Sequence, residues 1–270
     1  MSRLSAAAAG LLRLTLVELA RNGLPPEEPE VLRALAGLSW RLELQTRGAR
    51  AAAWLAAAHD IFGANVRTAE ALLREAHDLD LQRRLEDLLV GRLEPEWLGR
   101  YVEVSSIPEG ASRFLLLSAP HPLLTLRALA AARPGLAVVD APEPEAADAT
   151  DRRLQARFAA ARGQVPVLWE RSVEAANRAA GEGRAVACVV RPARPVRDVA
   201  TALENGAVAG TPVGEASGAA PVVAVLVHRS RDKRWRVELG PEEAPAAALT
   251  RLAAHVRRWP GQHLPWVVGG

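Results

Sequence analysis

The chain has 270 residues, of which 49% are hydrophobic, so it can bury a real core and is not a disordered chain. The formal net charge is only +3, and the basic residues, nearly all arginine, alternate with acids, as is typical of solvated helix faces. We therefore expect no nucleic-acid partner, whereas a surface for phosphates or anionic lipid head groups is a second interpretation of the arginines.

The first hundred residues are predicted to be helical. An apolar stretch at 4–20 is interrupted by Arg13 and Glu18, which argues against a membrane-spanning helix and a signal peptide. We interpret it as a helix packed on the core, with a helix lying on a membrane surface as the alternative. Pro25 and Pro26 end this helix. Further helices are expected at 51–59, 66–77 and 79–90.

After residue 101 the pattern changes to short apolar runs separated by helical stretches. Strands are expected at 114–117, 136–139, 165–168 and 185–190, and helices at 123–132, 152–162 and 173–180. This alternation predicts right-handed crossovers and a mostly parallel sheet. Runs at 222–228 and 234–239 predict an antiparallel hairpin at the sheet edge, followed by a helix at 246–258.

The predicted fold class is therefore α/β, with a mixed, mostly parallel sheet flanked by helices. We predict two regions. Residues 1–100 form a helical N-terminal region packed on the main domain, and residues 101–270 form the α/β domain.

His121 is the best candidate for a chemical centre, because it follows the buried strand at 114–117. In open α/β sheets, ligands bind beyond the carboxyl ends of the strands. A histidine there could act as a general base if a carboxylate held its other ring nitrogen. No acid occurs between Glu109 and Asp140. His121 is thus either a catalytic base or a structural histidine that caps the next helix, and Asp140 is either a distant acid or a strand-end turn residue.

Common catalytic motifs are missing from the sequence. It contains no phosphate-binding glycine loop, no dinucleotide fingerprint and no nucleophile elbow. The histidines are not paired at metal-ligand spacing, so we expect neither a metal nor a cofactor. Cys188, in "RAVACVV", is expected to be a small buried hydrophobe in a reducing compartment.

Several segments follow one another in a distinctive order: "NVRTAEALL", "FLLLSAPHPLLTL", "GTPVGEASGAAPVVAVLVHRSRDKRWRVEL" and "HVRRWPGQHLPW". This order resembles the lipid A (lauroyl/myristoyl) acyltransferase branch of the lysophospholipid acyltransferase superfamily. The resemblance implies that His121 is the catalytic histidine and that an acid should stand five residues later, where this chain has Leu126. It also implies substrate-binding roles for Thr211, Pro212, Gly214 and Arg229.

The resemblance implies transfer of a fatty acyl chain from an acyl carrier protein or coenzyme A to a lipid hydroxyl. Because loss of an orienting carboxylate can cost about 10⁴ in rate, we predict that this activity is very slow or absent. The alternative is a non-catalytic lipid-binding or partner-binding subunit on the same frame. A third interpretation is a protein-interaction module in which Trp259 and Trp266 make contacts, although core packing explains both. We expect a cytoplasmic protein, with peripheral binding to the inner membrane face as an extension.

Overall fold

The computed structural model describes residues 66–117, 122–140, 149–170, 172–192, 199–205, 208–209, 220–232 and 234–263, together with isolated positions before residue 66. The helices expected at 4–20 and 51–59 therefore lie outside the described residues, apart from those isolated positions.

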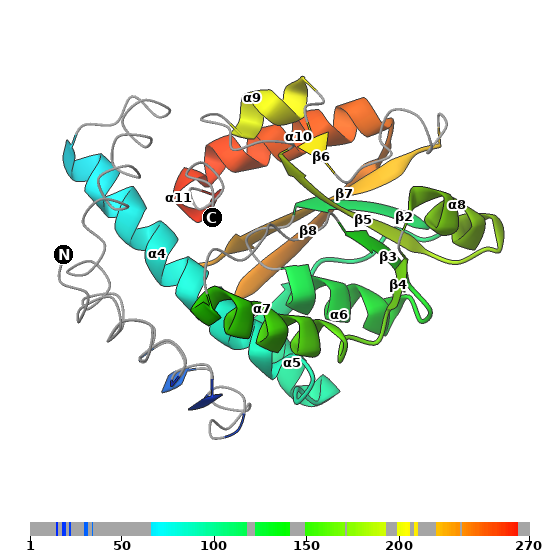
Figure 1. Ribbon diagram of the computed structural model, residues 1–270. Coiled ribbons are helices and arrows are strands. Elements are labelled where there is room, and N and C mark those ends of the chain that lie inside the picture. The colour runs from blue at the N-terminus through cyan, green and yellow to red at the C-terminus, as the bar shows by residue number, and fades with distance from the viewer. Residues whose placement is uncertain are drawn as a thin grey trace.

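A mixed, mostly parallel β-sheet forms the centre of the protein (Figure 1). Its described strands are β1 (Val102–Val104), β2 (Arg113–Leu117), β3 (Ala137–Asp140), β4 (Leu168–Glu170), β5 (Val186–Pro192), β6 (Val208–Ala209), β7 (Val222–Arg229) and β8 (Trp235–Glu243). Their order is β1-β8-β7-β2-β5-β3-β4, with β6 paired to β5 outside this row. Strands β7, β2, β5, β3 and β4 run parallel, whereas β8 is antiparallel to β7.

Helices cover both faces of this sheet. They are α4 (Val66–Leu89), α5 (Pro95–Tyr101), α6 (Pro122–Ala132), α7 (Ala149–Arg162), α8 (Val173–Gly181), α9 (Val199–Glu204), α10 (Pro245–Arg258) and α11 (Pro260–His263). Helices α4, α6 and α7 lie on one side of the sheet, and α8, α9 and α10 lie on the other (Figure 1).

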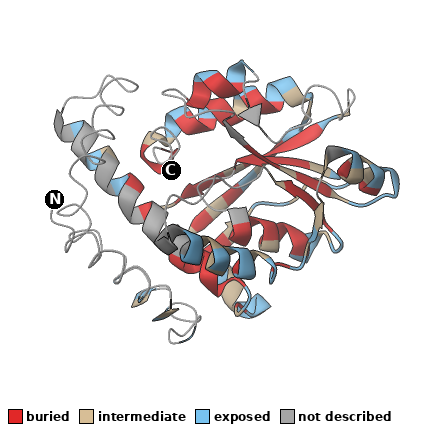
Figure 2. Ribbon diagram, in the orientation of Figure 1, coloured by how far each residue is buried: buried red, intermediate tan, exposed pale blue. Residues whose placement is uncertain are grey.

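The core is built by strand residues that alternate between the two faces. Leu116 and Val189 belong to the cluster beneath α4 and α6, whereas their neighbours Leu115 and Val190 belong to the cluster beneath α9 and α10. A parallel strand is usually buried on both faces, which is why these strands read as continuous apolar runs in the sequence. Figure 2 shows the resulting buried layer running through the strands and the inner faces of the helices.

The α/β class and the mostly parallel sheet predicted from the sequence are confirmed. Three expectations were wrong in detail. The helices expected at 66–77 and 79–90 are one helix, α4, because no glycine or proline interrupts it. The strand expected at 165–168 begins only at Leu168, since Val165 is buried in a turn.

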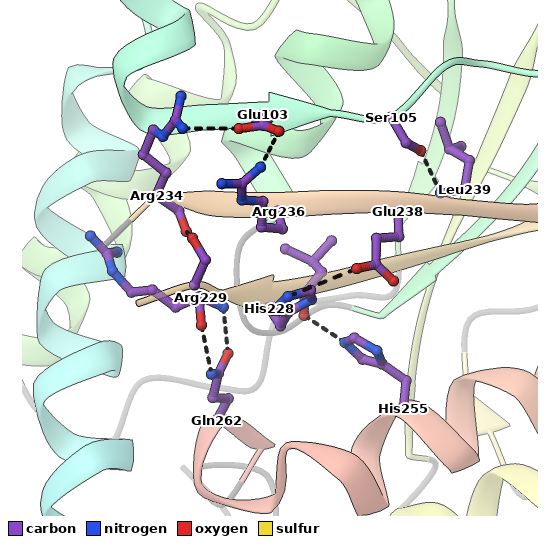
Figure 3. A network of polar contacts seen from close by, with 12 residues as sticks. Glu103, Ser105, His228, Arg229, Arg234, Arg236, Glu238, Leu239, His255 and Gln262 are labelled. Atoms are coloured by element: carbon purple, nitrogen blue, oxygen red, sulfur yellow. Dashed lines mark hydrogen bonds and ion pairs between the residues drawn. The ribbon is translucent and has the colours of Figure 1, made fainter. Parts of the chain in front are cut away.

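The third correction concerns the hairpin of β7 and β8. It is antiparallel as predicted, but it is not at the sheet edge, because β1 pairs in parallel with β8. Glu103 of β1 binds Arg236 of β8 and Arg234, the residue before β8, so ion pairs reinforce the added strand (Figure 3). The sequence did not indicate β1, which has only three residues.

Candidate functional site

The carboxyl edge of the parallel strands is where the sequence placed the site. Leu117 ends β2 and Pro122 begins α6, so the strand and helix expected to flank His121 are present. His121 itself lies outside the described residues, as do Thr211, Pro212 and Gly214. The roles predicted for these four residues therefore stay predictions.

Leu126, at the position where the resemblance would place the catalytic acid, is part of the core. Its residue surface is 1% exposed, and it belongs to the same cluster as Leu124 and Leu129 of α6. The helix is apolar along almost its whole length, and its described side chains from Leu123 to Leu126 are all buried. The leucine is therefore accounted for by packing.

Asp140, the distant acid considered for His121, lies at the end of β3. Its carboxylate binds the guanidinium of Arg162 on α7 at 3.2 Å. Arg162 in turn stacks on the ring of Trp169, with 3.9 Å between its guanidinium carbon and the ring centroid. Through Arg162 and Trp169, Asp140 links β3 to α7 and β4. This favours the interpretation of Asp140 as a structural residue.

Arg229, predicted to bind substrate, ends β7 at the same edge and is buried. Its guanidinium lies 3.4–3.5 Å from the carboxylate of Glu86, whose side chain is 0% exposed. Trp235 Nε1 donates a hydrogen bond to Glu86 at 2.6 Å, and Gln82 Nε2 donates another at 3.1 Å. The guanidinium also lies over the Trp235 ring, 4.8 Å from its centroid.

The backbone of Arg229 is held as firmly as its side chain. Its amide donates to Gln262 Oε1 at 2.7 Å, and Gln262 Nε2 donates to its carbonyl at 3.3 Å (Figure 3). Gln262 lies on α11. Its side-chain amide therefore joins this short helix to the backbone at the end of β7. Arg229 thus connects α4, the hairpin and α11, and its predicted contact with substrate stays a prediction.

Three histidines that the sequence did not single out gather on the other face of β7. His228 stacks on Trp259 with 4.6 Å between ring centroids, and it lies 5.5 Å from His255. His255 lies 5.9 Å from His263 and donates through Nε2 to the carbonyl of Val227 at 3.0 Å. His228 Nε2 also lies 3.9 Å from Glu238 (Figure 3).

This histidine cluster, His228, His255 and His263, is neutral at pH 7. Burial lowers the pKa of each ring, and it lowers the pKa of His263 to about 3. No group of three His, Cys, Asp or Glu side chains in the described part of the chain is arranged to hold a metal ion. The cluster therefore packs the end of α10 and α11 against the sheet and does not supply a base of raised pKa.

The histidine cluster predicts a loss of stability in acid. The unfolded chain, with histidine pKa values near 6.5, binds more protons than the folded chain between about pH 3 and pH 6.5. Stability therefore falls as the pH is lowered through this window, and His263 alone contributes about 2 kcal/mol of loss between pH 7 and pH 5. Urea unfolding at both pH values should show a smaller difference for His263→Phe than for the wild type. Equal differences in the two proteins would contradict this assignment.

The missed residues left weak signals in the sequence. Glu86 stands among Leu85, Leu88 and Leu89, so a carboxylate on an apolar stripe could have indicated a buried partner. The partner, Arg229, is 143 residues away, and no local spacing connects the two.

Comparisons with known proteins add no family: no family model matches the chain, and no curated protein matches it significantly. Among the described residues, no helix combines the length and the apolar character needed to cross a membrane.

Proposed function

We propose that the chain is an acyltransferase-like protein that binds a fatty acyl group, presented on an acyl carrier protein or coenzyme A, without transferring it at an enzymatic rate. The proposal combines the family resemblance with the position of His121 in the sequence, between the end of β2 and the start of α6. Strand β2 lies in the middle of the sheet, between β7 and β5. In open α/β sheets, ligands bind beyond the carboxyl ends of such strands.

The observation that carries the non-catalytic half of the proposal is the burial of Leu126. A histidine base needs a carboxylate to fix its tautomer and stabilise its charged form. At the position that the resemblance assigns to this acid, the chain has a leucine with 1% exposure. The helix packs that position into the core, among other apolar side chains.

Two of the described carboxylates near this edge, Asp140 and Glu86, have partners of their own. Asp140 binds Arg162, and Glu86 binds Arg229. Glu238, on the hairpin, is half-exposed and lies 3.9 Å from His228 Nε2. A role for Asp140 or Glu86 beside His121 would require breaking a contact seen in the described structure, and this supports binding over turnover.

The proposal also includes a membrane location for the protein. Acyl lipids lie in membranes, and an arginine-rich chain suits an anionic surface. We therefore include peripheral binding to the cytoplasmic face of a membrane in the proposal. Flotation with vesicles of phosphatidylglycerol, compared with vesicles of phosphatidylcholine, should enrich the protein on the anionic vesicles, and equal recovery would remove this part.

The test of the function is an acyl-transfer assay. Radiolabelled acyl groups on acyl carrier protein or coenzyme A are offered with lipid hydroxyl acceptors, and product is compared for the wild type, His121→Ala and no protein. We expect the three rates to agree, because Leu126 stands where the resemblance places the acid that would orient His121. Turnover in the wild type that His121→Ala abolishes would overturn the non-catalytic assignment. The acyl-carrier complex is measured separately by fluorescence anisotropy, and its absence would overturn the binding assignment.

A further inference from the structure

The short helix α11 depends on its contacts with other elements. It has four residues, and a helix of this length is not stable without tertiary contacts. The chain bends at Trp259, whose backbone angles (φ −127°, ψ 57°) end α10, and α11 begins at the next residue. We call residues 259–263 the α11 latch. It packs against α4 and α10 (Figure 1).

Few contacts hold the latch to the rest of the protein. Gln262 exchanges two hydrogen bonds with the backbone of Arg229 at the end of β7, at 2.7 and 3.3 Å (Figure 3). Gly261 lies directly against Glu75 and Leu72 of α4. The sheet, in contrast, is held by ladders of backbone hydrogen bonds. An element with few attachments can open locally while the remainder of a protein stays folded.

His263 is the titratable residue of the latch. It is 1% exposed, and its ring lies edge-on to that of His255 on α10, with 5.9 Å between centroids. His255 lies 5.5 Å from His228, on which Trp259 stacks. The latch therefore closes on a row of imidazole rings. A positive charge on His263 would be buried beside two further rings that can also take up a proton.

Charged groups face the histidine cluster from β7, β8, α10 and α4. Among the described side chains these are Arg229, Arg236, Glu238, Arg258, Glu75 and Glu86. Two of them, on β7 and α4, form the buried ion pair. Burial lowers the pKa of His228, the arginines of β8 and α10 lower it further, and Glu238 acts in the opposite direction. Burial raises the pKa of Glu75, against a smaller effect of its hydrogen bond with Gln262, so protonation of Glu75 favours the closed latch.

The burial of His263 couples the latch to pH. Burial lowers the pKa of this ring to about 3, with smaller contributions from His255 and His228. A histidine exposed to water has a pKa of about 6.5. Between these two values the open latch binds a proton that the closed latch does not, so acid favours opening. For His263 alone, lowering the pH from 7 to 5 should raise the ratio of open to closed latch roughly 25-fold.

We propose that residues 259–263 form an acid-sensitive latch, which is closed on β7 and α4 at neutral pH and swings away from them in acid while the sheet stays folded. Opening uncovers His228 and the backbone of Arg229, at the carboxyl edge of the sheet. The inference goes beyond the proposed function, because it requires neither His121 nor an acyl ligand.

Amide hydrogen exchange of the full chain, followed by NMR, separates the latch from the sheet. The amides of Arg229 and Gln262 report on the latch, because they donate to Gln262 Oε1 and to the carbonyl of Trp259. The amides of β5 report on global unfolding. After correction for the intrinsic exchange rate, protection of the two latch amides should fall roughly 25-fold from pH 7 to pH 5. At both pH values it should be roughly tenfold or more below that of β5.

Variants assign the effect to the histidine. His263→Phe keeps an aromatic ring and takes up no proton, so most of the fall should vanish, whereas Ala254→Ser, at an exposed position of α10, should keep it. Glu75→Gln removes the opposing carboxyl and should make the fall at least as large. His121→Ala should behave like the wild type, so failure of the proposed function would leave this result unchanged.

Two outcomes would overturn the proposal. The first is equal protection of the latch and β5 amides in the wild type at both pH values, which would mean that the latch opens only when the whole chain unfolds. This comparison needs no variant. The second is a fall in protection that His263→Phe leaves unchanged, which would mean that another group senses the pH.

Discussion

Replacing Glu86 by glutamine should lower the free energy of unfolding by about 3–5 kcal/mol, the range typical of removing one partner from a buried ion pair. The substitution keeps the shape of the side chain and an oxygen that can accept from Trp235. It removes the negative charge opposite Arg229, whose side chain is only 6% exposed. The guanidinium would then be a buried charge without its counter-ion. Urea unfolding followed by tryptophan fluorescence measures the change.

The control is a more exposed pair, in which the Glu243 side chain is 15% exposed. Glu243→Gln removes the partner of Arg251, whose side chain is 39% exposed, and should cost no more than about 1 kcal/mol. A double variant, Glu86→Leu with Arg229→Met, removes both charges and should recover much of the stability lost in Glu86→Gln. If Glu86→Gln unfolds at the same urea concentration as the wild type, the buried pair does not hold α4 to the hairpin.

The fold was largely predictable because its signals are local. Strands β2, β5 and β7 are buried on both faces, so each appears in the sequence as a short apolar run. The failures also have local causes. Strand β1 is too short to show a period, and Val165 is apolar because it fills the core from a turn.

The site was less predictable because its contacts are distant in sequence. Asp140 was recognised as a strand-end acid, but its partner Arg162 becomes visible only once α7 is folded beside β3. Arg229 was singled out through the resemblance, and its partner Glu86 could not be, since 143 residues separate them. His228 and His255 lie 27 residues apart and meet only because α10 packs against β7.

Leu126→Glu, the substitution that would restore an acid at the position suggested by the resemblance, should instead destabilise the protein by more than about 4 kcal/mol. The side chain sits in the core at 1% exposure. Losing a buried leucine removes roughly 2–3 kcal/mol of hydrophobic stabilisation, and an unpartnered carboxyl adds a desolvation cost of several kcal/mol. Urea unfolding, with circular dichroism as a check on helix content, measures the loss.

The pH dependence of this variant separates a buried carboxyl from a general loss of packing. Burial would raise the pKa of the new carboxyl above that of an unfolded glutamate, so the folded chain would bind the extra proton and stability would fall as the pH rises above about 4.3. Leu126→Glu should therefore be less destabilised, relative to the wild type, at pH 4.5 than at pH 7. Leu126→Met should cost less than about 1.5 kcal/mol at either pH, and Ala131→Glu, on an exposed position of the same helix, should cost little. If Leu126→Glu kept wild-type stability and gained acyl transfer, position 126 would face a site, and the non-catalytic assignment would fall with the packing argument that supports it.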